Sequence, residues 1–201
     1  MAKHNITLSS PTPGLVDYYL HEWEKLKNYT LQEKALNKLF FYLCPQNNDI
    51  ESILLKVAAL NDFYSTNIFS VFPVAEHIRS IIDIDKRLSE GDISLVVDIQ
   101  RITISNVEKN FYSFATKYCS HHQPDKFPIY DSYVDQVLRA YRKLDNFSLF
   151  KNEDLKNYDK FCCILKEFRV NYNLESFSLK QIDRFLWLIG KDNFPKSYKK
   201  N

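Results

Sequence analysis

The chain has 201 residues, of which 45% are hydrophobic, 26% are charged and 15% are aromatic. These are values of a globular protein, long enough for one buried core and short for two. No apolar run reaches the ~18 residues of a membrane span, and residues 1–14 lack the apolar core of a signal peptide. We therefore expect one cytoplasmic domain over residues 1–201, without a membrane association, with an N-terminal arm at 1–14 and a basic tail at 191–201.

Positive charge is concentrated in the second half of the chain, although the net charge is only +2. Residues 1–100 contain 9 Lys and Arg against 13 Asp and Glu, whereas residues 101–201 contain 18 against 12. A phosphate-binding surface requires such an excess. An ordinary solvated helical surface with a soluble tail would have the same composition, so the charge alone leaves both interpretations open.

In the first half, apolar residues at helical spacing predict helices over residues 15–26, 31–43 and 50–60. Thr30-Leu-Gln-Glu33 is a capping box that should open the second of these helices. Residues 64–72 look like a short helical or irregular element, and Pro73 suits the first turn of a helix that runs to about Ile82. The β-branched residues of 93–102 permit a strand, but their spacing fits a short helix better.

In the second half, the same periodicity predicts a helix over residues 155–168. Ser178-Leu-Lys-Gln181 is a second capping box, which should open a helix over 182–189 that ends at Gly190. The predicted fold class is therefore all-α, a compact domain of several helices in two layers.

The four cysteines, Cys44, Cys119, Cys162 and Cys163, have no CxxC spacing. We expect reduced, buried thiols. A zinc site built from Cys119, His121 and His122 is disfavoured because consecutive histidines rarely converge on one metal. The two histidines are better explained as residues at a helix end, where imidazolium meets the negative end of the helix dipole. We expect no metal and no cofactor.

The segment from Asn110 to Val134 places a lysine and an aspartate on either side of a loop that contains two prolines. Lys117 lies on a predicted helix roughly 120° away from its apolar face, so we expect its amine to reach a cleft or water. The loop over residues 123–128 cannot continue that helix, since its prolines lack an N–H. Asp131 precedes an apolar-periodic run and should lie at the N-terminus of the next helix.

A lysine in a helix that is entered from a short hairpin, then a loop, then an aspartate at the next helix start, is the order of helix-hairpin-helix DNA glycosylases. SFATKYCSHHQPDKFPIYDS most resembles bacterial proteins with the 8-oxoguanine DNA glycosylase (OGG) fold. A fainter likeness runs from Leu60 to the chain end. The glycine-rich hairpin of the family has no counterpart here, and the spacing of 14 residues from Lys117 to Asp131 is shorter than usual. We expect Asn106 and Asn110 to supply the left-handed turns that glycine normally provides.

The resemblance implies an HhH-GPD fold and roles for individual residues. Lys117 would attack the sugar and form a Schiff base, while Asp131 would stabilise positive charge on the sugar. The alternatives are a solvated surface lysine and a plain helix N-cap. The implied base pocket contains Tyr64, Asn67 and Tyr130, for which a capping turn and core tyrosines are the alternatives. The implied DNA-binding residues are Lys109, Ser113, Lys126 and Arg139.

Three functions are consistent with the sequence. The first is a DNA N-glycosylase, with or without AP-lyase activity, which excises an oxidised or modified base from duplex DNA. The second is a glycosylase-like DNA-binding protein without catalytic activity, suggested by the missing glycine hairpin. The third is a helical protein-interaction module, favoured by the low net charge.

Overall fold

The computed structural model describes residues 8–195 of the chain. The all-α prediction is confirmed, because the regular structure of the described residues consists of ten α-helices, one π-helical turn, one 3₁₀ turn and a single two-stranded hairpin. Contacts divide the chain into two compact units. The central unit is Leu26–Tyr130, and the terminal unit combines Met1–Lys25 with Asp131–Asn201. We expected a single domain over residues 1–201. That the two units unfold together as one domain stays a prediction. None of the helices within residues 8–195 combines the length and the apolar character that a bilayer span needs.

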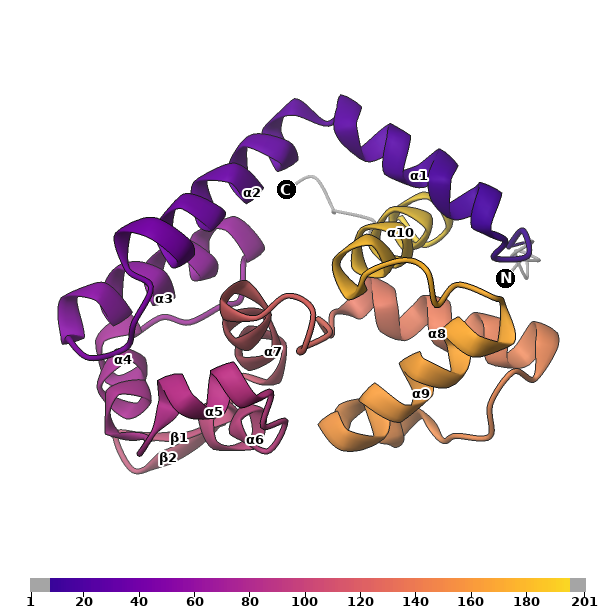
Figure 1. Ribbon diagram of the computed structural model, residues 1–201. Helices are drawn as coiled ribbons and strands as arrows, with labels where there is room; N and C mark the ends of the chain where they lie inside the picture. Colours follow the sequence, from indigo (N-terminus) through magenta and orange to yellow (C-terminus); the bar gives the residue numbers. More distant parts are fainter. Residues whose placement is uncertain (1–7, 196–201) are drawn as a thin grey trace, which may run out of the picture. The chain divides into compact units, whose positions relative to one another are not determined.

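The central unit contains most of the elements in Figure 1. Five of the predicted helices appear in it with shifted ends, namely those over 31–43 and 50–60, the Pro73 helix, the one over 93–102 and the Lys117 helix. The elements in chain order are α2 (Lys27–Lys38), the π-helical turn η1 (Leu39–Leu43), α3 (Ile50–Tyr64), α4 (Val71–Ser80), α5 (Ile84–Glu90), α6 (Leu95–Gln100), β1 (Arg101–Ile104), β2 (Val107–Asn110) and α7 (Tyr112–His122). Pro73 does lie in the first turn of its helix, as predicted.

Helix α7 is the most deeply buried element of the central unit. Every residue from Phe114 to His122 is buried, so no side of the last two and a half turns faces water. The neighbours of α7 are α3, α6 and η1. A helix that is buried on all sides must satisfy its polar side chains inside the protein.

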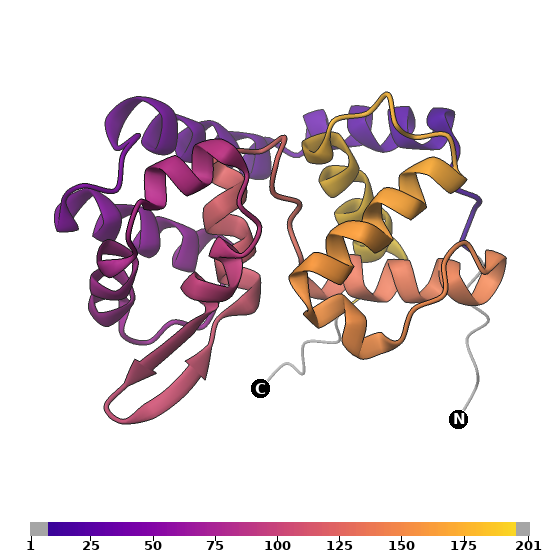
Figure 2. The same cartoon turned by 60° about the horizontal axis from the view of Figure 1, so that its bottom comes forward.

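A β-hairpin leads directly into α7 and projects away from the helices of the central unit (Figure 2). Ile104 pairs with Val107, so the turn consists of Ser105 and Asn106, both with positive φ (49° and 61°). Two left-handed residues in a two-residue loop give the type I′ turn that suits a twisted hairpin. The prediction for Asn106 is confirmed. That for Asn110 was wrong, because Asn110 ends β2, where its side chain accepts a hydrogen bond from the Tyr112 N–H at 3.1 Å.

The first predicted capping box does not form. Helix α2 begins at Lys27, so Thr30 lies inside the helix and donates its hydroxyl to the Lys27 carbonyl at 3.1 Å. The start of α3 is capped instead by Asp49, whose carboxylate accepts from the Ser52 N–H at 2.7 Å. The predicted helix over 93–102 is shorter than expected, since α6 ends at Gln100 and the chain continues as β1.

The terminal unit is a small helical bundle. Its elements are α1 (Pro13–Lys25), α8 (Ser132–Asp145), the 3₁₀ turn η2 (Asn152–Lys156), α9 (Tyr158–Asn171) and α10 (Leu179–Asn193). Helix α10 packs against both α1 and α8. Both halves of the second capping box, Ser178 and Gln181, form as predicted. In the predicted arm, Leu8 is buried and the Ser9 carbonyl accepts from the Tyr141 hydroxyl at 2.8 Å, while residues 1–7 lie outside the described part.

Gly190 does not end its helix as predicted, because α10 continues to Asn193. The reason for the glycine is close packing against α8. A Cβ at this position would lie 2.7 Å from the Tyr133 Cβ and 3.1 Å from Val137 Cγ2. In the predicted basic tail, Lys191 belongs to α10 and places its ammonium 4.8 Å from the centre of the Trp187 ring. Lys196, Lys199 and Lys200 lie outside the described residues.

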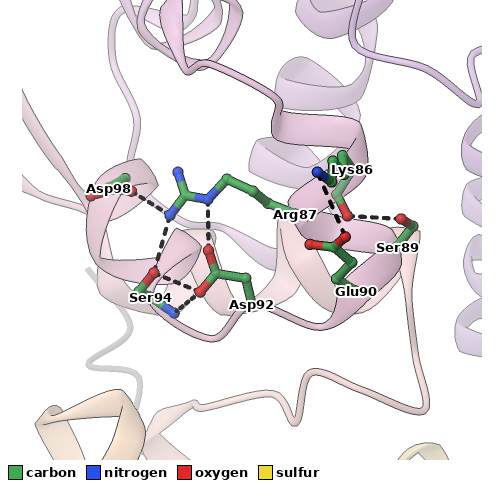
Figure 3. A network of polar contacts seen from close by, with 7 residues as sticks. All are labelled: Lys86, Arg87, Ser89, Glu90, Asp92, Ser94 and Asp98. Carbon is green, nitrogen blue, oxygen red and sulfur yellow. Dashed lines mark hydrogen bonds and ion pairs between the residues drawn. The ribbon is translucent and has the colours of Figure 1, made fainter.

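Arg87 joins α5 to α6 through a network of ion pairs and hydrogen bonds (Figure 3). Its guanidinium donates to Asp92 and to Asp98, both at 2.7 Å, and to the Ser94 hydroxyl at 3.1 Å. The Arg87 side chain is only 22% exposed. Hydrogen bonds from Ser94 and from Arg87 hold the pKa of Asp92 below its ordinary value. The network therefore contributes most above that ordinary pKa and is lost as the pH falls.

Arg87→Gln should lower the free energy of unfolding by about 1–3 kcal/mol, because it leaves the half-buried Asp92 and the exposed Asp98 without their shared donor. The neighbouring Lys86 is the matched control: its ammonium lies 4.0 Å from Glu90, and the two side chains are 70% and 60% exposed. Lys86→Gln should change the stability by no more than about 0.5 kcal/mol. Urea unfolding followed by circular dichroism measures both variants. Equal effects of the two substitutions would contradict the structural role of the network.

Candidate functional site

The central unit buries two lysine side chains against α7. Lys56, from α3, is fully buried, and Lys117, from α7 itself, is 3% exposed. Lysine is almost never fully buried unless its ammonium is paired or hydrogen-bonded. Each of these two amines is accordingly surrounded by hydrogen-bond acceptors and aromatic rings, and the two form separate sites.

The amine of Lys117 lies in a pocket of polar and aromatic groups. Its Nζ donates to Ser113 Oγ at 2.7 Å and to the Tyr130 carbonyl at 3.3 Å, and it lies 5.2 Å from the centre of the Tyr64 ring. The expectation that this amine reaches a cleft or water was wrong, and so was the alternative of a solvated lysine. Lys117 is three residues from Phe114 and four from His121, which places it on a buried face of a helix that has no exposed face.

Several residues predicted from different parts of the sequence come together at Lys117. Tyr64 ends α3, Ser113 lies in the first turn of α7 and Tyr130 ends the following loop, yet all three contact the lysine amine. The half-buried Tyr112 joins them, since its ring centre is 4.7 Å from that of Tyr130. The Lys117 amine therefore lies against the Tyr64 ring, and its acceptor Tyr130 belongs to a second pair of aromatic rings. Aromatic rings are groups that can stack on a planar ligand.

Asn67 was predicted to belong to the same base pocket as Tyr64 and Tyr130, and it lies in a turn after the end of α3. Tyr64 is the last residue of α3, and the chain then turns through the left-handed Ser65 and Asn67, with φ values of 49° and 59°. Asn67 is exposed. The side chain of Asn61 fixes this turn by accepting from the Ile68 N–H at 2.9 Å and from the Thr66 hydroxyl at 2.8 Å.

Asp131 is the N-cap of α8, as predicted. Its Oδ1 accepts hydrogen bonds from the N–H groups of Tyr133 at 2.8 Å and Val134 at 2.9 Å. Asp131 belongs to the terminal unit, whereas Lys117 belongs to the central unit. The face-to-face arrangement of Lys117 and Asp131 that the resemblance implies stays a prediction.

The predicted DNA-binding cations differ in their surroundings. Lys109 is exposed on β2, and Lys126 is exposed but donates to the Ser89 carbonyl at the end of α5. Arg139, on α8, lies 2.9 Å from the Asp135 carboxylate. By sequence, Leu26–Tyr130 contains 11 Lys and Arg against 12 Asp and Glu, while the other unit contains 16 against 13. The positive excess therefore belongs to the terminal unit, and Lys117 lies in a nearly neutral one.

Lys56 forms the second site, which the sequence analysis missed. Its Nζ donates to the Gln46 carbonyl at 2.8 Å and to Asn47 Oδ1 at 2.7 Å, and it lies 3.3 Å from His122 Nε2. Burial lowers the pKa of Lys56 to about 8, although the Asp85 carboxylate partly opposes this shift. The detectable signal was that Lys56 shares the helical spacing of the buried residues Ile53, Val57 and Leu60.

Asn47 connects this second lysine to a carboxylate and a tyrosine. Its Oδ1 also accepts from the Tyr118 hydroxyl at 2.5 Å, while its Nδ2 and backbone N–H donate to the two Asp85 oxygens at 2.5 and 2.9 Å. The buried amide thus lies between the Lys56 ammonium and the Asp85 carboxylate and hydrogen-bonds to both. A fully satisfied network of this kind fixes the loop before α3 against α5 and α7.

The two histidines do not cap α7, contrary to prediction. His121 Nε2 is hydrogen-bonded to the Tyr64 hydroxyl at 2.9 Å, and both imidazole rings lie against the Phe40 ring, with centre distances of 5.3 and 4.9 Å. Burial, and then the nearby Lys56 charge, lower the pKa of His122 well below its ordinary value, so this ring is neutral. Its Nε2 can therefore accept a hydrogen bond from the Lys56 ammonium.

The cysteines are free thiols, two of them in the core. Cys44 and Cys119 are buried as predicted, whereas Cys162 is half-buried and Cys163 is exposed. Burial raises the pKa of the Cys119 thiol, so that it stays protonated. No group of three or more metal-ligating side chains occurs within residues 8–195.

Comparison with known proteins places the chain in a family. Residues 15–126 match the HI_0787_N family, described as an N-terminal domain. The chain belongs to this family. It is also 55% identical, over 148 residues, to an uncharacterized protein of Haemophilus influenzae, a match that covers 74% of this chain and 71% of the relative. No solved structure matches the chain. The family segment includes Lys56 and Lys117 but ends before Asp131.

Lys56 should make the protein more stable as the pH rises from 7 to 9.5. The folded-state pKa of about 8 lies below the ordinary 10.5, so in this range the folded protein loses a proton that the unfolded chain keeps. Stability therefore rises with pH, by about 1–2 kcal/mol. In Lys56→Met this contribution should be absent. Subtracting the variant's pH profile of urea unfolding from that of the wild type removes the contributions of tyrosines and cysteines. Parallel profiles would contradict the buried ammonium.

Proposed function

We propose that the protein is a DNA N-glycosylase, with or without AP-lyase activity, and that Lys117 is its nucleophile. The observation that supports this proposal is the convergence of Lys117 with Tyr64, Ser113 and Tyr130, which come from three separate segments and were each predicted as site residues. The β1–β2 hairpin before α7 and the Asp131 cap after the loop agree with the order of elements that the resemblance implies.

The reaction requires that the target nucleotide leave the duplex stack, because the C1′ carbon is inaccessible within it. The neutral Lys117 amine would attack C1′, and the base would leave with the electrons of the glycosidic bond and take up a proton. Opening of the sugar ring then gives a Schiff base, from which loss of a C2′ proton expels the 3′ phosphate. Burial disfavours the charged form of an amine, which is the direction that nucleophilic attack needs.

The surrounding groups would supply recognition and charge stabilisation. Three tyrosines of the site, Tyr64, Tyr112 and Tyr130, are half-buried. Their rings can stack on an extruded base once the base displaces the groups that contact the Lys117 amine. Asp131 would stabilise positive charge that develops on the sugar. Its Oδ1 already accepts two backbone N–H bonds, which hold the carboxylate in a fixed position at the start of α8.

A helical protein-interaction module is the second candidate. The central unit exposes large apolar side chains, among them Phe69 at 98%, Ile82 at 80% and Tyr42 at 79%. Exposed apolar groups of this size are typical of contact surfaces, and the nearly balanced charge of this unit is unfavourable for phosphate binding. A glycosylase-like protein that binds DNA without cleaving it would differ from both candidates, because its duplex binding would fall steeply with salt but no base would be released.

Borohydride should trap the wild-type protein covalently on duplex DNA that contains a suitable modified base, because only a Schiff base is reduced to a stable amine. Lys117→Met should abolish trapping, while Lys56→Met, which removes the other buried lysine, should retain it. A panel of modified-base duplexes, followed by denaturing gel electrophoresis, measures the adduct. If Lys56→Met loses trapping while Lys117→Met retains it, Lys117 is not the nucleophile. The absence of both trapping and base release on every duplex would reject the glycosylase proposal.

Asp131→Asn should distinguish the role of Asp131 as the N-cap of α8 from its proposed role in stabilising charge on the sugar. Asparagine is as good an N-cap as aspartate, so the substitution should change the free energy of unfolding by less than about 0.5 kcal/mol, whereas Asp131→Ala should cost about 1 kcal/mol. If the carboxylate stabilises the charged sugar, Asp131→Asn should still slow base release by about 10²-fold. Single-turnover excision and urea unfolding are the two measurements. Full activity in Asp131→Asn would leave Asp131 with a structural role only.

A further inference from the structure

A pocket of about 210 Å³ lies in the central unit, where η1 and the following turn meet α5 and the end of α7. Its wall includes Phe41, Pro45, Gln46, Asp85 and His122. His122 is five residues after Lys117, which places it about 140° around α7 from that lysine. The pocket is therefore on another side of the helix and is not part of the Lys117 site.

The charges around this pocket favour a cation. Of the eight residues that line it, Asp85 alone carries a charge, because His122 is held neutral by its burial. Lys56 lies behind the wall, and its three N–H groups point to Gln46, Asn47 and His122 rather than to a ligand. The Asp85 carboxylate accepts two hydrogen bonds from Asn47 and retains acceptor sites for two more.

The shape of the pocket rim favours a flat cation. Phe41, which is 41% exposed, contributes a planar aromatic ring to the wall, and the exposed Pro45 contributes an apolar ring. A guanidinium stacks on such faces and forks onto a carboxylate, whereas an ammonium is a compact, strongly hydrated charge. A carboxylate beside a phenyl ring is thus a better match for arginine than for lysine.

The surface next to the pocket points to a polypeptide as the carrier of that arginine. Phe41 is followed by Tyr42 and Leu43, which are 79% and 63% exposed. Three consecutive exposed apolar residues are unfavourable on a surface unless another molecule covers them. They lie in a π-helical turn, a distortion of the helix that is frequent at functional sites.

We propose that this pocket binds the guanidinium group of an arginine side chain from a partner protein, with Asp85 as counter-ion and Phe41 as stacking face. Tyr42 and Leu43 then contact apolar residues beside that arginine. The proposal does not depend on glycosylase activity, since it uses neither Lys117 nor Asp131.

The test uses N-acetyl-arginine methylamide as a probe of the pocket in the full-length protein. Its citrulline counterpart has nearly the same shape without the charge, and its lysine counterpart has the charge without the plane. In ¹H–¹⁵N NMR titrations, the arginine probe should shift the amide signals of Gln46, Asp85 and Gln123, with a dissociation constant on the order of millimolar. The citrulline and lysine probes should bind at least about fivefold more weakly.

Phe41→Ala should weaken binding of the arginine probe by about fivefold, as expected for the loss of one stacking contact. Phe72→Ala is the matched control, because Phe72 on α4 is 52% exposed but does not line the pocket, and it should leave binding of the small probe unchanged. Asp85→Asn should abolish binding in protein that urea unfolding shows to be folded. Equal binding of citrulline or lysine, shifts that spread away from the pocket, or unchanged binding in Phe41→Ala would each overturn the proposal.

Discussion

The burial of two lysine amines against one helix is the constraint on which the central unit depends. Removing an ammonium from water costs several kcal/mol, so each lysine must donate its hydrogen bonds to fixed acceptors. Lys56 donates to the turn before α3, and Lys117 donates to Ser113 and to the end of the loop at Tyr130. The two lysines thus tie α7 to segments on either side of it in the sequence. The buried histidines and the Phe40 ring fill the space between these sites.

The two sites differ in what surrounds the amine, and this difference suggests different roles. The Lys56 ammonium is held in a closed network through Asn47 to Asp85 and Tyr118, which is the arrangement of a structural contact. The Lys117 amine donates to the Ser113 hydroxyl and to the Ser113 and Tyr130 carbonyls, and it lies against the face of the half-buried Tyr64. If Lys117 is the nucleophile that we propose, a substrate must displace the groups that cover its amine, because the folded central unit leaves this side chain only 3% exposed.

The sequence was sufficient to predict the fold class, most helices and three of the residues that contact Lys117, but not the burial of its amine. Helix periodicity identifies the apolar faces, yet in α7 all faces are buried, and a lysine 120° from the apolar stripe is then no longer exposed. The Lys56 network combines an asparagine, an aspartate and a histidine that are up to 75 residues apart, and no local pattern indicates such a contact. Gly190 was misassigned for a similar reason, because close packing of two helices leaves no sequence signal distinct from a helix stop.

Lysine accessibility tests the central claim most directly. Native protein treated with an amine-acylating reagent and analysed by peptide mapping should react rapidly at the exposed Lys86 and Lys109. Lys56 and Lys117 should remain unmodified until the protein is unfolded in urea, because neither amine is accessible in the folded central unit. Labelling of Lys56 or Lys117 at the rate of Lys86 would contradict the buried arrangement around α7.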